Sequence, residues 1–400
     1  MIEREKLRRA FVERYGRGGR LFRAPGRVNL IGEHTDYNGG FVLPLAIERE
    51  TVVAAAPRED RRVNVYSLNV GEAAAFDLDA PGERRRGIWL DYVEGVAHAL
   101  EDGGTHLRGT DLMILSDVPV GAGLSSSAAL EVSTGLALAE IAGQEIDRVQ
   151  LALAGQQAEH TYVGTMCGIM DQFVASLGQA GHALLIDCRT LEASPVPLDT
   201  SEAAIVITDT EVKHELSSSA YNERRAQCEE GVRALQQFLP NVEQLRDVSV
   251  EDFERYADRL PEVIRRRCRH VVTEDARTLE AADALRHGRL EEVGQLMRRS
   301  HESLRDDYEV SCAELDFLAE TSWTLPGVVG SRMTGGGFGG STVSLVRRDA
   351  LEQYRQAITP EFTRRFGHAP TIYVTDAGDG AKEIKDEGGR MKDEVKAKLP

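Results

Sequence analysis

Residues 119–130 read Pro119-Val120-Gly121-Ala122-Gly123-Leu124-Ser125-Ser126-Ser127-Ala128-Ala129-Leu130. A strand-like run, Leu112-Met113-Ile114-Leu115, precedes this loop, and an alanine-rich stretch with helix-forming composition, 126–141, includes its end. Glycines allow the backbone to curl so that successive N–H groups converge, and the helix start adds free N–H groups and the positive end of its dipole. The segment therefore predicts a strand–loop–helix unit that can bind an anion.

The three serines of this loop can be interpreted as a helix cap or as part of an anion-binding site. A helix cap after a flexible loop needs only one serine, whereas hydroxyls at Ser125, Ser126 and Ser127 can also hold an anion or Mg²⁺. Three serines after two glycines favour the interpretation that the loop binds an anion. No lysine follows the glycines, so the loop is not a Walker A loop.

Around this loop, residues 1 to about 190 read as mixed α/β. Further strand candidates are 41–47, 51–55 and 183–186, and a second helical stretch covers 148–162. From about 221 to 320 the chain changes to long charged helices with few glycines. The clearest pair flanks Gly288, where apolar residues recur at helical spacing at Leu279, Ala282, Leu285, Leu290, Val293, Leu296 and Met297.

A glycine cluster near the C-terminus offers a misleading motif. Residues 335–340 satisfy G-x-G-x-x-G, but a dinucleotide loop of that pattern needs a helix next, and 341–346 is β-branched and strand-like. With 327–332 before it, the cluster reads as the turn of a hairpin, although a purely structural turn seldom needs five glycines. Beyond Gly378 charged residues dominate, which predicts a solvated or frayed tail.

Composition narrows the class of protein. Four hundred residues with 42% hydrophobic content suffice for two domains, and a net charge of −17 argues against nucleic acid as a partner. Five scattered cysteines without a C-x-x-C pair fit reduced thiols. The charged N-terminus lacks an apolar signal segment, and no run approaches the roughly eighteen apolar residues of a membrane span. We therefore expect a soluble cytoplasmic protein.

Two further segments carry chemistry. Gly26-Arg27-Val28-Asn29-Leu30-Ile31-Gly32-Glu33-His34-Thr35-Asp36-Tyr37-Asn38 combines a cation with two carboxylates and suits a polyhydroxylated ligand, although a polar loop between strands is equally compatible. Gly164-Thr165-Met166-Cys167-Gly168-Ile169-Met170-Asp171-Gln172-Phe173 places one acid in an apolar run. Asp171 there is either a helix-start acid stabilised by the dipole or a reacting group.

These segments together resemble the galactokinase family, within the GHMP kinase superfamily of homoserine and mevalonate kinases. The 26–38, 119–130 and 332–340 segments match the three family motifs in order, and the likeness runs from about Phe22 to Tyr373. The resemblance implies an α/β fold of two domains, with a ribosomal-protein-like N-terminal domain, a ferredoxin-like C-terminal domain and the active site between them. We expect boundaries at 1–190, 191–377 and a charged tail at 378–400.

The resemblance also implies roles for individual residues. Asp171 and Arg27 match the catalytic pair, and Ser127 and Glu159 match the Mg²⁺ ligands; unaided, Glu159 would pass as a helix-surface charge. Asp171 either abstracts the proton of the sugar C1 hydroxyl or orients that hydroxyl while the proton leaves late. The implied sugar contacts are Glu33, His34, Thr35, Asp36, Asp171 and Tyr221. The implied ATP contacts are Ser67, Trp89, Tyr92, Gly121, Ala122, Gly123, Leu124, Ser125, Ser126, Ser127, Gly335, Gly336 and Gly337.

Some of these assignments have ordinary alternatives. Trp89 and Tyr92, three apart on a helix, are more often core residues. The activity implied is ATP- and Mg²⁺-dependent formation of galactose 1-phosphate by a monomer that needs only small-molecule partners. An anomeric kinase of N-acetylgalactosamine or another galacto-configured sugar is the nearest alternative, and a non-catalytic sugar sensor on the same scaffold is the other.

Overall fold

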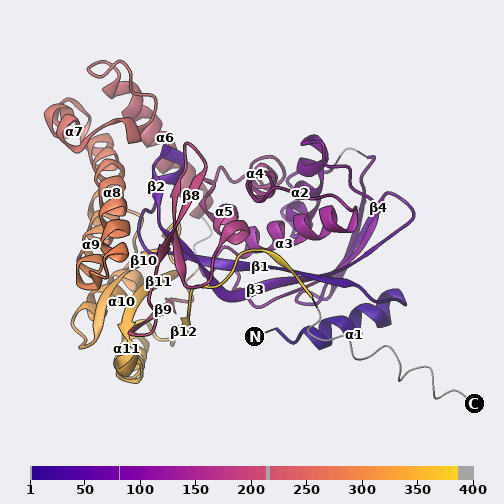
Figure 1. Ribbon diagram of the computed structural model, residues 1–400. Coiled ribbons are helices and arrows are strands. Elements are labelled where there is room, and N and C mark those ends of the chain that lie inside the picture. Colours follow the sequence, from indigo (N-terminus) through magenta and orange to yellow (C-terminus); the bar gives the residue numbers. More distant parts are fainter. Residues whose placement is uncertain (1, 81, 213–216, 386–400) are drawn as a thin grey trace, which may run out of the picture.

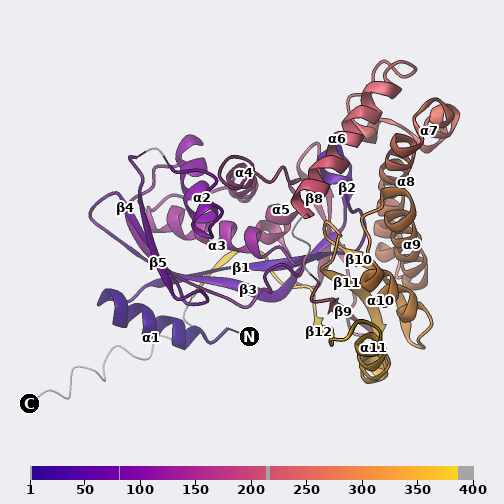
Figure 2. The same cartoon turned by 180° about the vertical axis from the view of Figure 1, so that it is seen from behind.

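The computed structural model describes residues 2–80, 82–212 and 217–385. The N-terminal half of the chain forms one body and most of the C-terminal half forms a second body beside it (Figure 1). Figure 2, seen from behind, shows the same two bodies, joined by the long strands β1 (Arg20–Asn29) and β3 (Pro44–Pro57) that extend towards the second body. No helix among the described residues is both long enough and apolar enough to cross a bilayer.

A six-stranded sheet forms the first body, in the order β13-β1-β3-β6-β4-β5. Only the β4–β6 pair is parallel among the paired strands of this sheet. Its other strands are β4 (Arg62–Ser67), β5 (Glu72–Asp77), β6 (Thr110–Ser116) and β13 (Lys382–Ile384). Helices α2 to α5 cover one face of the sheet, whereas α1 covers the other (Figure 1). These helices are α1 (Arg4–Tyr15), α2 (Leu90–Asp102), α3 (Ser126–Ile141), α4 (Arg148–Ala158) and α5 (Met170–Leu177).

The second body is built on an antiparallel sheet in the order β10-β11-β9-β12. These strands are β9 (Ala203–Asp209), β10 (Val328–Thr334), β11 (Ser341–Arg347) and β12 (Thr371–Thr375). Helices α10 (Ala313–Trp323) and α11 (Leu351–Phe366) pack on one face. The other face shares a core with α8 (Glu262–Arg286), α9 (Leu290–Ser303) and residues of β1 and β3 such as Val28 and Leu45. This common core fixes the two bodies against each other.

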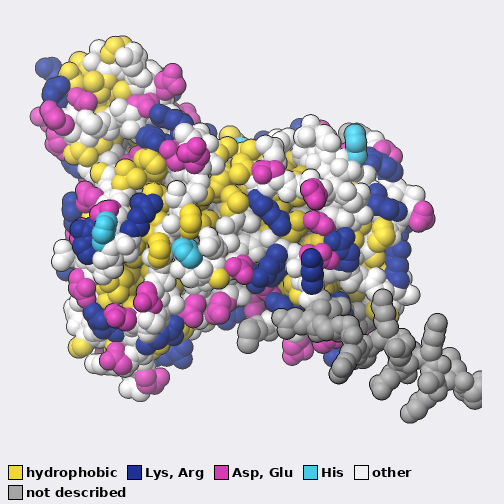
Figure 3. Space-filling view, viewed as in Figure 1, with side chains coloured by type: hydrophobic (Ala, Val, Ile, Leu, Met, Phe, Trp, Pro, Cys, Tyr) yellow, Lys and Arg dark blue, Asp and Glu magenta, His cyan; other side chains and the backbone are white. Residues whose placement is uncertain are grey.

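Two smaller units complete the molecule. A three-stranded sheet, β2-β7-β8, is formed by β2 (Phe41–Val42), β7 (His182–Asp187) and β8 (Glu192–Pro197). A helical arm, made by α6 (Ser217–Leu235), α7 (Val250–Tyr256) and the first half of α8, rises above the second body (Figure 1). Over the visible face, acidic and basic side chains are interspersed (Figure 3).

A bulge in β1 brings the serine-rich loop to the sheet. The register between β1 and β3 shifts between Pro25 and Arg27, and the backbone N–H of Arg27 donates to the carbonyl of Leu124 at 3.1 Å. A side chain at Gly26 would clash, because its Cβ would lie 2.6 Å from that carbonyl oxygen. Gly26 therefore permits the close approach that positions the loop beside Arg27.

Most local predictions agree with the structure. Helix α3 has the predicted bounds, and the stretch 148–162 forms α4 followed by a π-helical turn, Glu159–Val163. Both strand candidates, 41–47 and 51–55, lie in strands, but they are not separate strands, because β2 covers Phe41–Val42 and β3 runs unbroken from Pro44 to Pro57. Buried Glu50 is paired with Arg4 and Arg23, so the charged residues at 48–50 continue the strand.

The prediction of a solvated tail from Gly378 was wrong for the described residues up to 385. Strand β13 pairs with β1, Ala381 is buried, and a Cβ at Gly380 would lie 2.6 Å from the carbonyl oxygen of Ser176. Residues 386–400 lie outside the described part of the chain. Leu279, which shares the helical spacing of Ala282 and Leu285, is 41% exposed, and the expected domain boundary at 190 falls inside the β7–β8 hairpin.

Candidate functional site

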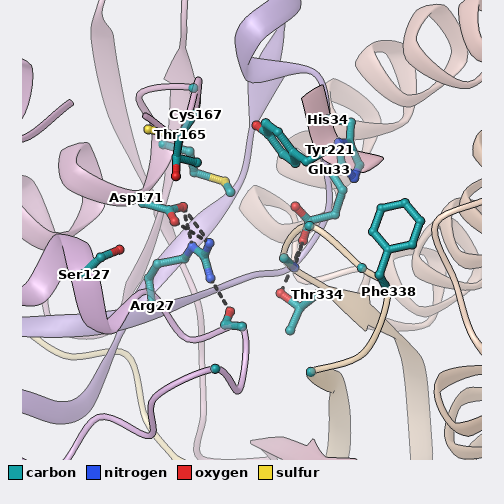
Figure 4. A pocket seen from close by; sticks show the side chains of 18 of the residues that line it. Arg27, Glu33, His34, Ser127, Thr165, Cys167, Asp171, Tyr221, Thr334 and Phe338 are labelled. Atoms are coloured by element: carbon teal, nitrogen blue, oxygen red, sulfur yellow. Dashed lines mark hydrogen bonds and ion pairs between the residues drawn. The ribbon is translucent and has the colours of Figure 1, made fainter. Parts of the chain in front are cut away.

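A cavity of about 440 Å³ opens where the three motif segments meet (Figure 4). The first motif supplies Arg27, Glu33, His34 and Asp36 to its lining, and the serine-rich loop supplies Gly121, Gly123 and Ser127. The glycine cluster lines it from Gly335 to Gly340. Segments that lie about two hundred residues apart in the chain thus share one pocket, as the sequence predicts.

Asp171 and Arg27 form an ion pair in this pocket. Nε and Nη2 of Arg27 each donate to a carboxylate oxygen of Asp171 at 2.7 Å, while Nη1 donates to the carbonyl of Gly123 at 2.6 Å (Figure 4). The Arg27 side chain is 6% exposed, whereas that of Asp171 is 27% exposed. The arginine is therefore fixed by two partners, and the acid keeps an open face towards the cavity.

Ser125 makes a third contact to the same acid. Its hydroxyl donates to Oδ2 of Asp171 at 2.5 Å, and the residue adopts the left-handed backbone conformation with φ at 58°. A non-glycine residue pays about 1–2 kcal/mol for that conformation. The resemblance implied that Ser125 contacts a phosphate of ATP. In this structure its hydroxyl instead donates a hydrogen bond to Asp171, and the residue does not line the cavity.

The serine-rich loop is held by its carbonyl groups. Oγ of Ser341 donates to the carbonyl of Ala122 at 2.7 Å, and a Cβ at Gly335 would lie 3.2 Å from the carbonyl oxygen of Gly123. The second and third glycine segments therefore touch each other. The start of α3, at Ser126, carries the free N–H groups of any helix N-terminus and can receive an anion.

Ser127 and Glu159 both line the cavity and could hold a divalent cation. Burial raises the pKa of Glu159 to about 7, and a hydrogen bond from Ser127 opposes this shift. Oxygen ligands of this kind suit Mg²⁺. Within the described residues, no group of three or more His, Cys, Asp or Glu side chains could hold a metal ion. Ser127 and Glu159 are therefore the residues that could hold a Mg²⁺ ion in this cavity.

Glu131 lies near Glu159 but, unlike Glu159, does not line the cavity. It is fully buried on α3 and accepts a hydrogen bond from Nε2 of Gln172 at 3.0 Å. Burial, Glu159 and Asp171 all raise its pKa well above the ordinary value. Acidic groups thus gather beneath the serine-rich loop, and a bound cation would relieve their repulsion.

Glu33 joins the first motif to the glycine cluster. One of its oxygens, Oε1, accepts from the backbone N–H of Gly335 at 2.7 Å and lies 3.3 Å from the Thr334 hydroxyl (Figure 4). Burial raises the pKa of Glu33, while Arg332 and Arg27 oppose that shift. Glu33 therefore has a structural role in this pocket in addition to the sugar contact implied by the sequence.

The remaining predicted sugar contacts surround the same side of the cavity. Asp36 lies so close to Gly168 that a Cβ there would stand 1.7 Å from its Oδ2. Burial and then Asp171 raise the pKa of Asp36 to about 7. The ring of Tyr221 lies 5.5 Å from the ring of His34, and burial lowers the pKa of His34 to about 3. The histidine is neutral at physiological pH.

Several residues of the sequence prediction do not reach the cavity. The Thr35 hydroxyl lies 2.8 Å from the carbonyl oxygen of Gly32 and 2.6 Å from that of Phe41, so it closes its own loop instead of meeting a ligand. Ser67 caps a turn at Val70, and Nε1 of Trp89 donates to Glu72 at 3.2 Å. Tyr92 alone of the three predicted adenine contacts lines the cavity. Ala122 and Leu124 point into the core, and Ser126 is also absent from the lining.

The cavity also includes residues for which the sequence predicted no individual role. They are Thr165, Cys167, Gly168, Met170, Val212, Thr334, Phe338, Gly339 and Gly340. All except Val212 lie within the segments 164–173 and 332–340 that the sequence singles out. Val212 carries no such signal, because it follows a strand of the second body whose position relative to the pocket is a tertiary property.

Comparisons with known proteins agree with this geometry. A galactokinase galactose-binding signature matches residues 9–57, and the N- and C-terminal domains of GHMP kinases match residues 91–179 and 281–363. A galactokinase of Chloroflexus aurantiacus is 50% identical over 381 residues, covering 95% of this chain and 97% of that protein. One of Exiguobacterium sibiricum is 42% identical, covering 96% of this chain and 99% of that protein.

Solved structures show the same likeness. Lactococcus lactis galactokinase complexed with galactose matches with a TM-score of 0.92 at 38% identity, covering 96% of this chain and 100% of that chain. Mevalonate kinase of Methanococcus jannaschii matches with a TM-score of 0.62 at 15% identity, covering 90% of this chain and 99% of that chain. The second match concerns the fold alone.

Proposed function

The chain belongs to the galactokinase family, and we propose that its pocket transfers the γ-phosphoryl group of ATP to the C1 hydroxyl of α-D-galactose. The products are galactose 1-phosphate and ADP, which makes the reaction an entry step of galactose catabolism. The observation that carries the proposal is the Arg27–Asp171 pair, which opens into a cavity lined by the serine-rich loop and the glycine cluster.

Asp171 is the proposed acceptor of the sugar proton. Its exposed face receives a hydrogen bond from the C1 hydroxyl, which aligns the oxygen with the terminal phosphorus of ATP. As the loose transition state forms and the oxygen bonds to phosphorus, the hydroxyl proton passes to Asp171. Arg27 holds the carboxylate in place and offsets negative charge on the transferring group.

The nucleotide side of the proposal rests on backbone donors. With a net charge of −17, the protein offers no general attraction for ATP, so local N–H groups must meet the phosphates. The glycines at 121, 123 and 335–337 allow the phosphates to approach the backbone closely. Ser127 and Glu159 would hold Mg²⁺, which when bound neutralises phosphate charge.

The sugar side contains groups that can read hydroxyl positions. Glu33, Asp36, His34 and Tyr221 line the cavity around Asp171, and each offers a polar atom to a ring hydroxyl. A site built to bond one hydroxyl discriminates strongly against an epimer that places it elsewhere. This donor and acceptor set supports selectivity for a galacto-configured sugar.

We further propose that the enzyme acts in the cytoplasm as a monomer on small molecules alone. All five cysteines have free thiols, the state that a reducing compartment maintains.

A sugar-panel kinase assay with product analysis tests the proposal. Galactose, N-acetylgalactosamine, glucose and 2-deoxygalactose would each be offered with Mg²⁺-ATP, and phosphorus NMR would identify the phosphorylated position. We expect galactose to give the highest kcat/KM and phosphorylation at C1. A preference for the acetylated sugar would overturn the choice of substrate, and galactose binding without ADP formation would indicate a sensor instead of a kinase.

A further inference from the structure

The proposed sugar contacts of the first motif lie on one short segment, residues 32–41, which we call the sugar segment. Three of its side chains line the cavity: Glu33, His34 and Asp36. The Thr35 hydroxyl lies 2.8 Å from the carbonyl oxygen of Gly32 and 2.6 Å from that of Phe41, so it ties the two ends of the segment together. The three cavity-lining side chains therefore stand on a closed loop, and their position depends on what holds that loop.

Helix α8 of the second body contacts both ends of the sugar segment through the backbone of the segment. Oε1 of Glu274 accepts a hydrogen bond from the N–H of Gly32 at 3.0 Å, and Oδ1 of Asp275 accepts one from the N–H of Phe41 at 2.6 Å. These two residues of α8 are 0% and 8% exposed. Backbone N–H groups inside a protein need such partners, because an unpaired one is costly. Two adjacent residues of one helix therefore hold both ends of the loop.

Two further contacts hold carbonyl groups of the sugar segment. Nε2 of His270, which also lies on α8, is 3.1 Å from the carbonyl oxygen of Glu33. Nη1 of Arg246 donates to the carbonyl of Gly39 at 3.0 Å. Arg246 belongs to the 3₁₀-helical turn Leu245–Asp247, which precedes α7. We call the four contacting residues the helical clamp: Arg246, His270, Glu274 and Asp275.

The sugar segment fits against α8 without intervening side chains. Gly32 has a backbone conformation that favours glycine, with φ at 100°, and a Cβ there would lie 2.9 Å from Oγ1 of Thr278 on α8. A Cβ at Gly40 would overlap Oδ1 of Asp275. Glycine permits both approaches because it has no Cβ. The helix therefore packs directly on the backbone of the segment, and the segment follows the position of α8.

No residue of the helical clamp lines the cavity, so the clamp acts on a ligand only through the sugar segment. We propose that the four clamp residues are positioning residues, which set where the cavity-lining side chains of the segment meet the bound sugar. Their contacts are to backbone groups, so they determine the place of those side chains and not their chemistry. The inference rests on the proposed function for the identity of the sugar, whereas the hold of the clamp on the segment is a property of the free protein.

The clamp should influence sugar binding without influencing the reacting pair. Asp171 is held by Arg27 and Ser125, and Arg27 is held in turn by the carbonyl of Gly123; these contacts include no clamp residue. A displaced sugar segment should therefore weaken galactose binding and leave the chemical step and ATP binding nearly intact. A loss of binding that is equal in the ground state and the transition state appears as a higher KM at unchanged kcat.

Hydrogen exchange measures the hold of the clamp without any ligand. Asp275→Leu removes the acceptor of the Phe41 N–H, whereas Asp275→Asn has a similar shape and keeps an acceptor oxygen. By mass spectrometry, we expect peptides that cover 31–42 to exchange about tenfold faster in Asp275→Leu and at the wild-type rate in Asp275→Asn. Peptides that cover the serine-rich loop should be unchanged in both variants. Unchanged exchange at 31–42 in Asp275→Leu would overturn the proposal, whatever the kinase assay gives.

Steady-state kinetics on the same matched pair tests the consequence for the sugar. We expect Asp275→Leu to raise the KM for galactose by about tenfold, since one hydrogen bond to the segment is lost, while kcat and the KM for ATP change less than about twofold. Asp275→Asn should keep the wild-type KM, which a role of Asp275 confined to its charge does not predict. An equal rise in the KM values for galactose and ATP in Asp275→Leu would contradict the proposal.

Arg246→Met is the second variant, and it decides the question if Asp275→Leu does not fold. It removes the donor to the Gly39 carbonyl from outside α8 and should also raise the KM for galactose alone; an unchanged KM would overturn the proposal. Asp111→Leu is the control for lost stability, because Asp111 is 4% exposed and pairs with two arginines away from the cavity. It should leave the exchange at 31–42 and both KM values unchanged. A wild-type protein that protects the sugar segment but does not phosphorylate galactose would instead count against the proposed function.

Discussion

Two arginine–carboxylate pairs border the cavity, and they are built in opposite ways. Arg27 contacts both oxygens of Asp171 at 2.7 Å, and Asp171 keeps 27% of its side chain exposed. Arg332 stands 3.5 Å from Glu33, and these side chains are 0% and 2% exposed. The first pair has bidentate geometry and an exposed carboxylate, whereas the second pair is almost completely buried, although Glu33 still lines the cavity.

The second pair is also less completely satisfied. Nη1 of Arg332 donates to the carbonyl of Asn29 at 3.1 Å, but Nε and Nη2 have no hydrogen-bond partner among the described residues. Glu274, 4.0 Å away, adds a second buried carboxylate. The two pairs show that an arginine–carboxylate pair beside this pocket can leave its acid exposed, as at Asp171, or bury it and join two loops, as at Glu33.

Replacing Asp171 should have the largest effect. Asp171→Asn keeps the shape and one acceptor oxygen but cannot take a proton, so we expect kcat to fall by about 10³-fold with galactose affinity nearly unchanged. Single-turnover kinetics and galactose titration measure the two quantities. A kcat within about tenfold of the wild type would mean that Asp171 only orients the hydroxyl.

Asp187→Asn is the matched control for that prediction. Asp187 also forms a bidentate pair, with Arg246, and Nη2 of that arginine lies 2.7 Å from Oδ2. This pair does not border the cavity. The variant should lose a little stability and keep its kcat.

Removing Arg332 should have its main effect on stability. Arg332→Met leaves Glu33 and Glu274 buried without this cation, and breaking a buried pair costs about 3–5 kcal/mol. Urea unfolding measures the change. Arg364→Met, which breaks an exposed helix-surface pair with Glu361, should leave the free energy of unfolding almost unchanged. Equal losses in the two variants would contradict the role of Arg332 in joining the loops.

The variants Ser125→Ala and Ser127→Ala distinguish a serine that positions Asp171 from a serine that contacts Mg²⁺-ATP. Ser125→Ala removes the 2.5 Å hydrogen bond to Asp171, so we expect kcat to fall by about tenfold while the KM for ATP changes little. Ser127→Ala should instead raise the KM for Mg²⁺-ATP more than it lowers sugar affinity. If the Ser125→Ala enzyme has weakened ATP binding and a normal kcat, Ser125 contacts the phosphates of ATP and does not position Asp171.

The smallest expected effect is on the pH dependence of stability, through the carboxyl group of Asp36. Its folded pKa of about 7 exceeds the ordinary value of 3.8, so the folded protein binds more protons than the unfolded chain between these values. Stability from this group is therefore lost as pH rises from about 4 to 7. Asp36→Asn escapes that loss and should gain about 1–2 kcal/mol over the wild type between pH 5 and pH 8, measured by urea unfolding. A gain that is independent of pH would reject the shifted pKa.

The sequence pointed to much of the cavity lining, because motif chemistry is local. Gly121, Gly123 and Ser127 share one loop, and Glu33, His34 and Asp36 share another; both loops line the cavity. Helix α3 was predicted to the residue for the same reason, since its alanine-rich composition favours one backbone conformation. Trp89 and Ser67, whose assignment relied on isolated positions outside the motifs, do not line the cavity.

The partner of each polar group could not be predicted in this way. Thr35 and Ser125 lie in loops that contribute to the cavity lining, yet the Thr35 hydroxyl contacts backbone carbonyls and the Ser125 hydroxyl contacts Asp171, 46 residues away. The charged segment after Gly378 likewise looked solvated by composition, but β13 completes the sheet beside β1. Such outcomes depend on which surfaces meet once the chain has folded.

The sequence by itself determined the α/β class, the helix that follows the serine-rich loop and the inventory of acids, glycines and hydroxyls. Backbone preference and local hydrogen bonding are encoded over a few residues, so these features can be read from the chain. Only the tertiary structure decided that Asp171 keeps an exposed face beside Arg27 while Glu33 is almost fully buried beside Arg332. Those distinctions depend on burial, which is set by residues hundreds of positions apart.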